Sequence, residues 1–168
     1  MSNNAINKLS ETLVKTLTLR GETISTAESI TGGLISAAIT DIPGASEVFL
    51  GGVVSYSNTM KKDELGISAA DIKKVGVVSE AIAVAMALAI KKRTKSTWAI
   101  SSTGVAGPGP SDGVPAGTVW IGIAGPKIAQ GIELSIAGKR EIVRLGAVES
   151  ALGAFERILS SSNSSKQK

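Results

Sequence analysis

The sequence predicts an α/β fold, a three-layer α/β/α sandwich around a mixed, mostly parallel sheet. Helical and strand patterns alternate along the chain, which is typical of proteins built from βα units. The 168 residues include 19 glycines, more than a helical bundle carries, and these favour tight βα turns. Hydrophobic residues make up 43% but aromatic residues only 3%, so the core must consist of small aliphatic side chains. We expect a single domain over residues 1–160 and a disordered polar tail over residues 161–168.

The first half of the chain contains four expected helices and two expected strands. Apolar residues at three- and four-residue steps predict a helix from about Ile6 to Arg20, followed by a short strand over residues 23–27. A second helix covers residues 34–39, and the loop 41–46 ends it. The apolar run 48–56 predicts a buried strand. Two short helices follow over residues 59–65 and 68–74.

The second half begins with an Ala-rich helix from Ser79 to about Arg93. A strand over residues 97–101 leads into a long loop rich in Gly and Pro, residues 104–117, which length and composition mark as functional or mobile. Two strands over residues 118–124 and 127–136 form a hairpin around Gly125 and Pro126 and add antiparallel strands to the sheet. The closing helix spans residues 139 to about 159.

Two absences from the composition exclude several kinds of catalytic site. The chain has no Cys, which excludes disulfides, thiol catalysis and cysteine-bound metals. It also has no His, so a Ser-His-Asp triad and the usual catalytic zinc site are excluded. Any general base must therefore be Lys, Asp, Glu, Tyr or water.

The net charge is compatible with several classes of binding partner and does not distinguish between them. A formal net charge of +4 fits an anionic small molecule as well as nucleic acid. Few aromatic side chains are present for base stacking and there is no dense basic stripe, so we expect no nucleic acid as partner. The N-terminus lacks the form of a signal peptide and no apolar stretch is long enough to cross a bilayer. We expect a cytoplasmic protein without a membrane partner.

Polar or glycine-rich turns follow three of the predicted strands, at residues 28–33, 55–58 and 102–104. Ligands bind beyond the carboxyl ends of parallel strands, so neighbouring strands would bring together Ser29, Tyr56, Lys61 and Thr103. In a chain without His, a desolvated lysine is the natural base for a serine nucleophile. On the residues alone the alternatives stay open: a helix cap at Ser29 or Thr31 and at Asn58, a solvated Lys61, and a packing role for Tyr56.

Several separate motifs occur in one order that resembles the CinA C-terminal domain family. They are Thr26-Ala27-Glu28-Ser29-x-Thr31-Gly32-Gly33, Tyr56-Ser57-Asn58-x-x-Lys61 with Leu65-Gly66, Thr103-Gly104-x-Ala106-Gly107-Pro108, Gly117-Thr118-Val119 and Arg140-x-x-x-Arg144. The resemblance covers roughly residues 5–160. Because several motifs occur together in one order, the resemblance is far more specific than a match to any single motif.

The resemblance implies a nicotinamide-nucleotide amidohydrolase of the PncC type, which converts nicotinamide mononucleotide to nicotinic acid mononucleotide and ammonia in pyridine nucleotide recycling. It implies the same α/β/α fold, a cytoplasmic homo-oligomer, and a Ser-Lys hydrolase that needs no metal and no cofactor. Ser29 matches the family's serine and Lys61 its lysine. We expect Tyr56 or Thr103 to orient Lys61 or the substrate amide. Substrate contacts are expected from Thr31, Gly32, Gly33, Asn58, Gly104, Ala106, Gly107, Arg140 and Arg144.

This chain departs from the family pattern in two places. Ile30 stands where the family often has Cys after the nucleophile, which we expect to alter packing only. The loop over residues 109–116 lacks the usual lysine, which leaves its substrate contacts open. The alternative function is a nucleotide- or phosphate-binding module of the same fold without catalysis.

Overall fold

The protein folds into five strands and six α-helices within the part of the chain that the structure, a computed structural model, describes, residues 3–163. In chain order the elements are α1 (Asn3–Arg20), β1 (Ile24–Glu28), α2 (Leu34–Thr40), the 3₁₀ turn η1 (Ala45–Glu47), β2 (Phe49–Val54), α3 (Asn58–Leu65), α4 (Ala69–Val75), α5 (Glu80–Thr94), β3 (Trp98–Gly104), β4 (Thr118–Gly125), β5 (Ile128–Ser135) and α6 (Arg140–Asn163).

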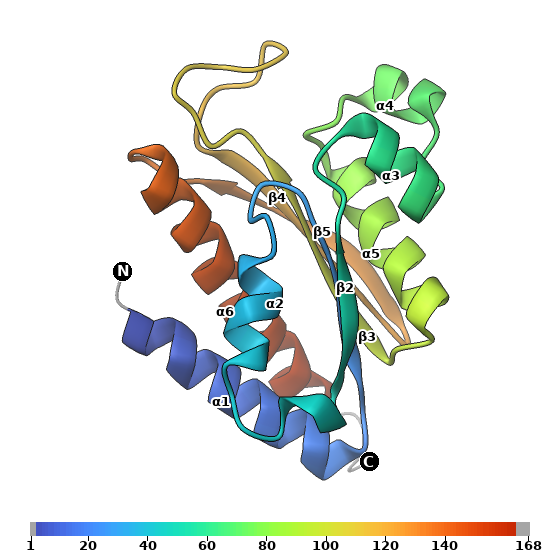
Figure 1. Cartoon of the computed structure of the whole chain (residues 1–168), viewed down its shortest axis with the longest axis vertical. Helices are drawn as coiled ribbons and strands as arrows, with labels where there is room; N and C mark the ends of the chain where they lie inside the picture. Colours follow the sequence, from blue (N-terminus) through green and yellow to red (C-terminus); the bar gives the residue numbers. More distant parts are fainter. Residues whose placement is uncertain (1–2, 164–168) are drawn as a thin grey trace.

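The strands form one sheet in the order β2-β1-β3-β4-β5. β1 lies parallel to both of its neighbours, while β4 is antiparallel to β3 and to β5. Four of the five strands therefore run in one direction. Helices α1, α2 and α6 cover one face, and α3, α4 and α5 cover the other (Figure 1). The predicted three-layer sandwich with a mixed, mostly parallel sheet is confirmed.

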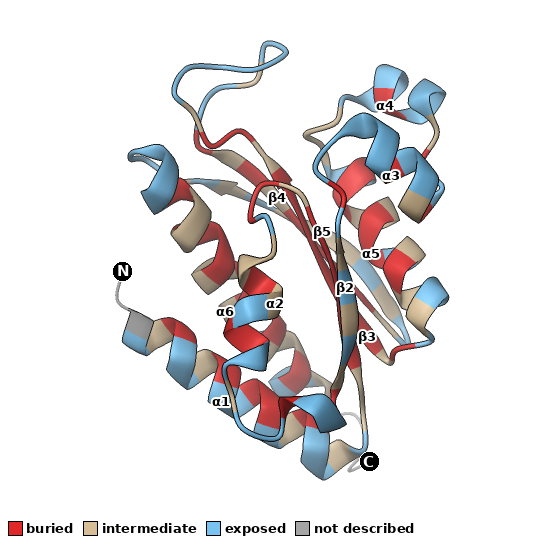
Figure 2. Cartoon of the chain, in the orientation of Figure 1, coloured by how far each residue is buried: buried red, intermediate tan, exposed pale blue. Residues whose placement is uncertain are grey.

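Each face of the sheet has its own apolar core (Figure 2). The larger core joins α1, α2 and α6 to the sheet, and Phe155 packs edge-on against Trp98 with ring centroids 5.4 Å apart. The smaller core lies under α5, around Ile82, Met86 and Ile90. The helices bury one face each, and none within residues 3–163 is long and apolar enough to cross a membrane.

Most element ends lie within a few residues of the sequence pattern, and three differences concern the sheet. β2 is shorter than the apolar run 48–56. β3 continues to Gly104 rather than stopping at residue 101, because its polar end pairs with β4 inside the sheet. The hairpin turn consists of Pro126 and Lys127, since Gly125 still pairs with Ile128.

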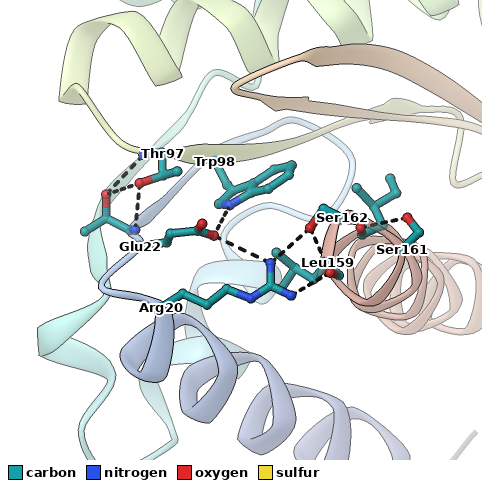
Figure 3. A network of polar contacts seen from close by, with 9 residues as sticks. Arg20, Glu22, Thr97, Trp98, Leu159, Ser161 and Ser162 are labelled. Atoms are coloured by element: carbon teal, nitrogen blue, oxygen red, sulfur yellow. Dashed lines mark hydrogen bonds and ion pairs between the residues drawn. The ribbon is translucent and has the colours of Figure 1, made fainter. Parts of the chain in front are cut away.

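A cluster of polar contacts holds the end of α6 against the end of α1 (Figure 3). Arg20 donates to the carbonyl of Leu159 at 2.6 Å and to the hydroxyl of Ser162 at 3.0 Å. These bonds connect the last turn of α1 to the last turns of α6, although the two helices lie far apart in the sequence. Residues 161–163 belong to α6, so the prediction of a disordered tail from residue 161 is wrong for these three residues. The rest of that predicted tail, residues 164–168, lies outside the described residues.

Candidate active site

The three strands that precede the predicted site residues are neighbours, with β1 in the middle. Backbone bonds continue one residue past the strand ends: Ser29 donates to the Ser102 carbonyl and Ser55 donates to the Glu28 carbonyl, both at 2.9 Å. The turns after β1, β2 and β3 are therefore held at the same edge of the sheet. This is the position at which open α/β sheets bind ligands.

Lys61 reaches this edge from α3 and directly contacts the turn over residues 29–33, the serine turn. Its Nζ donates to Ser29 Oγ at 3.0 Å and to the Ser55 carbonyl at 2.8 Å. The side chain is only 1% exposed, which is unusual for a lysine. Ser57 caps the start of α3 by accepting from Met60, and Gly66 ends it in the left-handed conformation, so both ends of this short helix are fixed.

Burial lowers the pKa of the Lys61 ammonium from its ordinary value of 10.5 to about 8. No carboxylate lies within ion-pair distance of it in the described part of the chain, so nothing offsets the loss of water. Because the Ser55 carbonyl holds one N–H, the neutral amine can direct its lone pair to the Ser29 hydroxyl. The pair thus has the geometry of a nucleophile and its base.

A cavity of about 300 Å³ opens at Ser29 and Lys61, near the lower limit of small-molecule sites. Its walls include Val77 and Val78, from the segment between α4 and α5, and the loop over residues 107–112. Nine of the thirteen predicted site residues line it: Ser29, Tyr56, Asn58, Lys61, Thr103, Gly104, Ala106, Gly107 and Arg140.

Arg140, at the start of α6, joins three segments at this cavity. It donates to the Tyr56 hydroxyl at 2.7 Å and to the Gly107 carbonyl at 2.9 Å. Both acceptors are neutral, and no carboxylate within residues 3–163 forms an ion pair with this exposed guanidinium. The cavity therefore has a positive charge at its wall whose remaining donors are available to an anion.

Thr103 and Asn58 both line the cavity but differ in burial and in their contacts. Thr103 is buried and donates its hydroxyl to the Val77 carbonyl at 2.9 Å, so only its oxygen lone pairs remain for another partner. Asn58 is the first residue of α3 and is exposed, while the cap itself is Ser57.

Of the other four predicted residues, Thr31, Gly32 and Gly33 lie in the serine turn and Arg144 lies on α6, and none of the four lines the cavity. Thr31 is fully buried, and its hydroxyl donates to Glu28 Oε2 at 2.6 Å. The Gly33 amide donates to the same oxygen at 3.0 Å. These groups are occupied within the protein, because the turn folds back over the Glu28 carboxylate.

Arg144, one helical turn after Arg140, binds the outside of the same turn. It donates to the carbonyls of Ile30 and Thr31, each at 3.0 Å. Its guanidinium lies against Gly32, where an added Cβ would be 3.1 Å from Nη2. The geometry gives Arg144 a contact with the backbone beside Ser29 and none with the cavity.

Sequence reasoning missed two groups that organise the site. For Glu28 the signal in the sequence is a carboxylate at the end of a buried strand, five residues before Gly33, the glycine that precedes α2. Ser55 contributes its backbone carbonyl, and no residue type is required to supply one. That contact has no signal in the sequence.

Comparison with known proteins identifies the family. The family model of the CinA C-terminal domain matches residues 6–159. A CinA-like protein from Prochlorococcus marinus is 47% identical over 144 residues, which are 83% of this chain and 34% of that protein. One from Acaryochloris marina is 43% identical, covering 86% of this chain and 35% of the relative. The chain thus spans about a third of the length of these curated relatives.

Solved structures agree with the same assignment. The crystal structure of the competence damage-inducible protein A from Klebsiella pneumoniae superposes with a TM-score of 0.89 at 33% identity, covering 92% of this chain and 97% of that one. A competence/damage inducible protein from Agrobacterium tumefaciens gives a TM-score of 0.88 at 34% identity, covering 93% and 96%. With the family model matching nearly all of the described residues, this chain belongs to the CinA C-terminal domain family.

Proposed function

We propose that this domain hydrolyses the carboxamide of nicotinamide mononucleotide to nicotinic acid mononucleotide and ammonia, with Ser29 as nucleophile and Lys61 as general base. The observation that supports it most is the 3.0 Å contact between Ser29 Oγ and the buried Lys61 Nζ. A lysine with a pKa of about 8 is largely protonated at neutral pH but keeps a neutral fraction able to accept a proton. The substrate is the one that the family resemblance implies.

The reaction proceeds by acyl transfer. Neutral Lys61 takes the proton of Ser29 Oγ as that oxygen forms a bond to the carboxamide carbon. The resulting ammonium gives the proton to the amide nitrogen, the C–N bond breaks, and ammonia departs. The acyl group remains on Ser29 as an ester. Lys61 then takes a proton from water, whose oxygen attacks the ester carbon. The ester C–O bond breaks, the proton on Lys61 returns to Ser29 Oγ, and the carboxylic acid product loses its remaining proton to water and leaves as the carboxylate.

Backbone amides beside Ser29 are suited to the negative charge of the tetrahedral intermediate. In the turn 29–33 the amides of Ser29, Gly32 and Gly33 already have acceptors. Those of Ile30 and Thr31 have none among the described residues. Of these two residues Ile30 lines the cavity, so we assign its N–H to the oxyanion, as a donor that needs no reorganisation during the reaction.

The phosphate of the mononucleotide is assigned to Arg140. Its guanidinium lines the cavity without a carboxylate partner, and charge-assisted bonds to phosphate are among the stronger ones in proteins. Arg144 is left out of this role because its guanidinium binds the carbonyls of Ile30 and Thr31.

An assay of ammonia release from nicotinamide mononucleotide tests the proposal, with nicotinamide adenine dinucleotide and free nicotinamide as comparison substrates. Ser29→Ala and Lys61→Ala are expected to abolish release while thermal unfolding shows a folded protein. Lys62→Ala, at the exposed neighbouring lysine, is the matched control and is expected to keep the activity. Saturable nucleotide binding by the unaltered protein without any ammonia would instead favour the non-catalytic binding module.

A further inference from the structure

The carboxylate of Glu28, the residue before Ser29, is buried completely and accepts five hydrogen bonds. Oε2 accepts from the hydroxyl of Thr31 at 2.6 Å and from the amides of Gly33 and Ile35, both at 3.0 Å. Oε1 accepts from the amide of Ser36 at 2.8 Å and from its hydroxyl at 2.7 Å. All five partners are donors, so the group acts purely as an acceptor, as a deprotonated carboxylate does.

Two further hydroxyls extend this arrangement to the neighbouring strands. Ser102 of β3 lies 2.6 Å from Thr31 Oγ1, and Thr26 of β1 lies 2.7 Å from Ser36 Oγ. Because Thr31 and Ser36 give their own protons to Glu28, Ser102 and Thr26 must be the donors in these contacts. Hydrogen bonds in such a chain polarise and strengthen one another. The carboxylate is thus the common acceptor that ties β1, β3 and α2 together.

This arrangement decides which amides near Ser29 are free. The first amides of a helix lack intrahelical acceptors and commonly bind an anion. In α2 that anion is Glu28 itself, so the amides of Gly33, Ile35 and Ser36 are not available to a substrate. Gly32 and Gly33, with φ of 58° and 98°, allow the chain to fold back over the carboxylate. The amides of Ile30 and Thr31 stay unpaired beside the nucleophile.

We propose that Glu28 is a positioning residue for the reaction at Ser29. Its carboxylate binds the start of α2 and the Thr31 hydroxyl, and thereby fixes the turn in the conformation that leaves the Ile30 amide unpaired beside Ser29, at the cavity. It does not touch the substrate and transfers no proton. The inference rests on the proposed Ser-Lys function and adds a residue to it.

Glu28→Gln tests this inference, because the amide group keeps the size of the side chain but brings its own donors. Wherever the NH₂ lies, it faces a backbone N–H, either that of Ser36 or those of Gly33 and Ile35. We expect kcat for the mononucleotide to fall roughly 100- to 1,000-fold, as for loss of oxyanion stabilisation, with KM changed less than about threefold. The pH midpoint, which Lys61 sets, should not move.

Ser25→Ala is the matched control, since Ser25 lies on the same strand, is equally buried, and loses a 2.7 Å contact with Ser96 at the other end of β1. It is expected to lower the unfolding temperature while leaving kcat intact. A Glu28→Gln protein with the kcat of the unaltered enzyme and only a lower unfolding temperature would reduce Glu28 to a structural residue and overturn the proposal.

A second readout separates this inference from the choice of substrate. The rate at which a sulfonyl fluoride modifies Ser29, followed by intact mass, does not depend on the mononucleotide. Labelling of the unaltered protein without ammonia release would refute the proposed substrate, and slower labelling of Glu28→Gln would still support the role of Glu28. If Glu28→Gln does not fold, Glu28→Asp replaces it. Its shorter side chain cannot hold both groups of donors, so labelling at the unaltered rate would overturn the proposal.

Discussion

Among single residues, Lys61 sets the expected pH dependence of the reaction. Only its neutral amine can accept the Ser29 proton, and burial places the pKa at about 8. The value of kcat/KM should therefore rise close to tenfold per unit below about pH 7 and level off above about pH 8 to 9. Initial rates from about pH 6 to 9.5 at constant ionic strength measure this. A flat profile across this range would exclude Lys61 as the base.

The same burial makes Lys61 a cost to folding at neutral pH. Its folded pKa of about 8 lies below the unfolded value of 10.5, so the unfolded chain binds more protons between these values. Below pH 8 the buried charge of Lys61 therefore lowers the free energy of unfolding by about 3 kcal/mol, and this loss disappears as the pH rises to 10.5.

Lys61→Met keeps most of the volume and removes the buried charge. It leaves the Ser55 carbonyl without its donor, which costs about 1 kcal/mol. We expect the variant to be inactive and more stable by roughly 1–2 kcal/mol at pH 7, with this gain lost or reversed near pH 10. Urea unfolding at both pH values provides the measurement, and a gain that is independent of pH would contradict the explanation.

The type of each site residue was easier to predict than the direction of its side chain. The absence of His and Cys, together with the motif order, selected Ser29 and Lys61 before any geometry was known. Arg140 and Arg144 share a helix face by their spacing of four. Arg140 lies at the cavity and Arg144 binds the turn carbonyls, and the segments that each turn of α6 contacts depend on tertiary packing, which the spacing of the two residues does not encode.

Among the elements, helix ends were predictable because they are set by local chemistry. Ser57, Ser68 and Ser79 each accept an amide bond at the start of a helix. The end of β3 was not predictable in this way. Ser102 and Thr103 look like part of a turn, yet they are buried between β1 and β4, where their hydroxyls form hydrogen bonds with Thr31 and with the Val77 carbonyl.

The close approach of α5 to β4 depends on Gly122. A Cβ there would collide with the Ala83 carbonyl and the Ser101 hydroxyl, neither of which can move away freely. Gly122→Ala is expected to destabilise the protein by roughly 1–3 kcal/mol through overpacking. Gly153→Ala is the control in α6, where the nearest atom is 3.6 Å away. It should stabilise slightly, by about 0.4–1 kcal/mol. Equal destabilisation of both variants in urea unfolding would refute overpacking at Gly122 as the cause.

At the scale of the whole molecule, the sequence predicted the layers but not the order of the strands. Alternating helices and strands suffice for an α/β/α sandwich. Placing β1 between β2 and β3 depends on contacts between segments far apart in the chain, and the convergence of Ser29, Lys61 and Thr103 was conditional on it. The same dependence explains why the unusual loop 109–116 could not be placed beforehand, although residues 109–112 and Val114 line the cavity.

Recognition of the phosphate also requires the whole fold, because the Arg140 contacts bring together α6, the loop after β3 and the segment after β2. Arg140→Met should raise KM for the mononucleotide roughly 10- to 100-fold, as expected for a charge-assisted bond of about 1.5–3 kcal/mol. The value of kcat should change little, since Ser29 and Lys61 stay paired. The salt dependence of KM should also weaken.

Arg157→Met, at an exposed arginine of the same helix outside the cavity, is the control for the loss of one positive charge. It should leave KM within about twofold, because a distant exposed charge is screened by salt. Steady-state rates of ammonia release for both variants at low and high salt give the comparison. Equal KM increases in the two variants would mean that net charge alone attracts the nucleotide, and the phosphate would then have to be assigned away from Arg140.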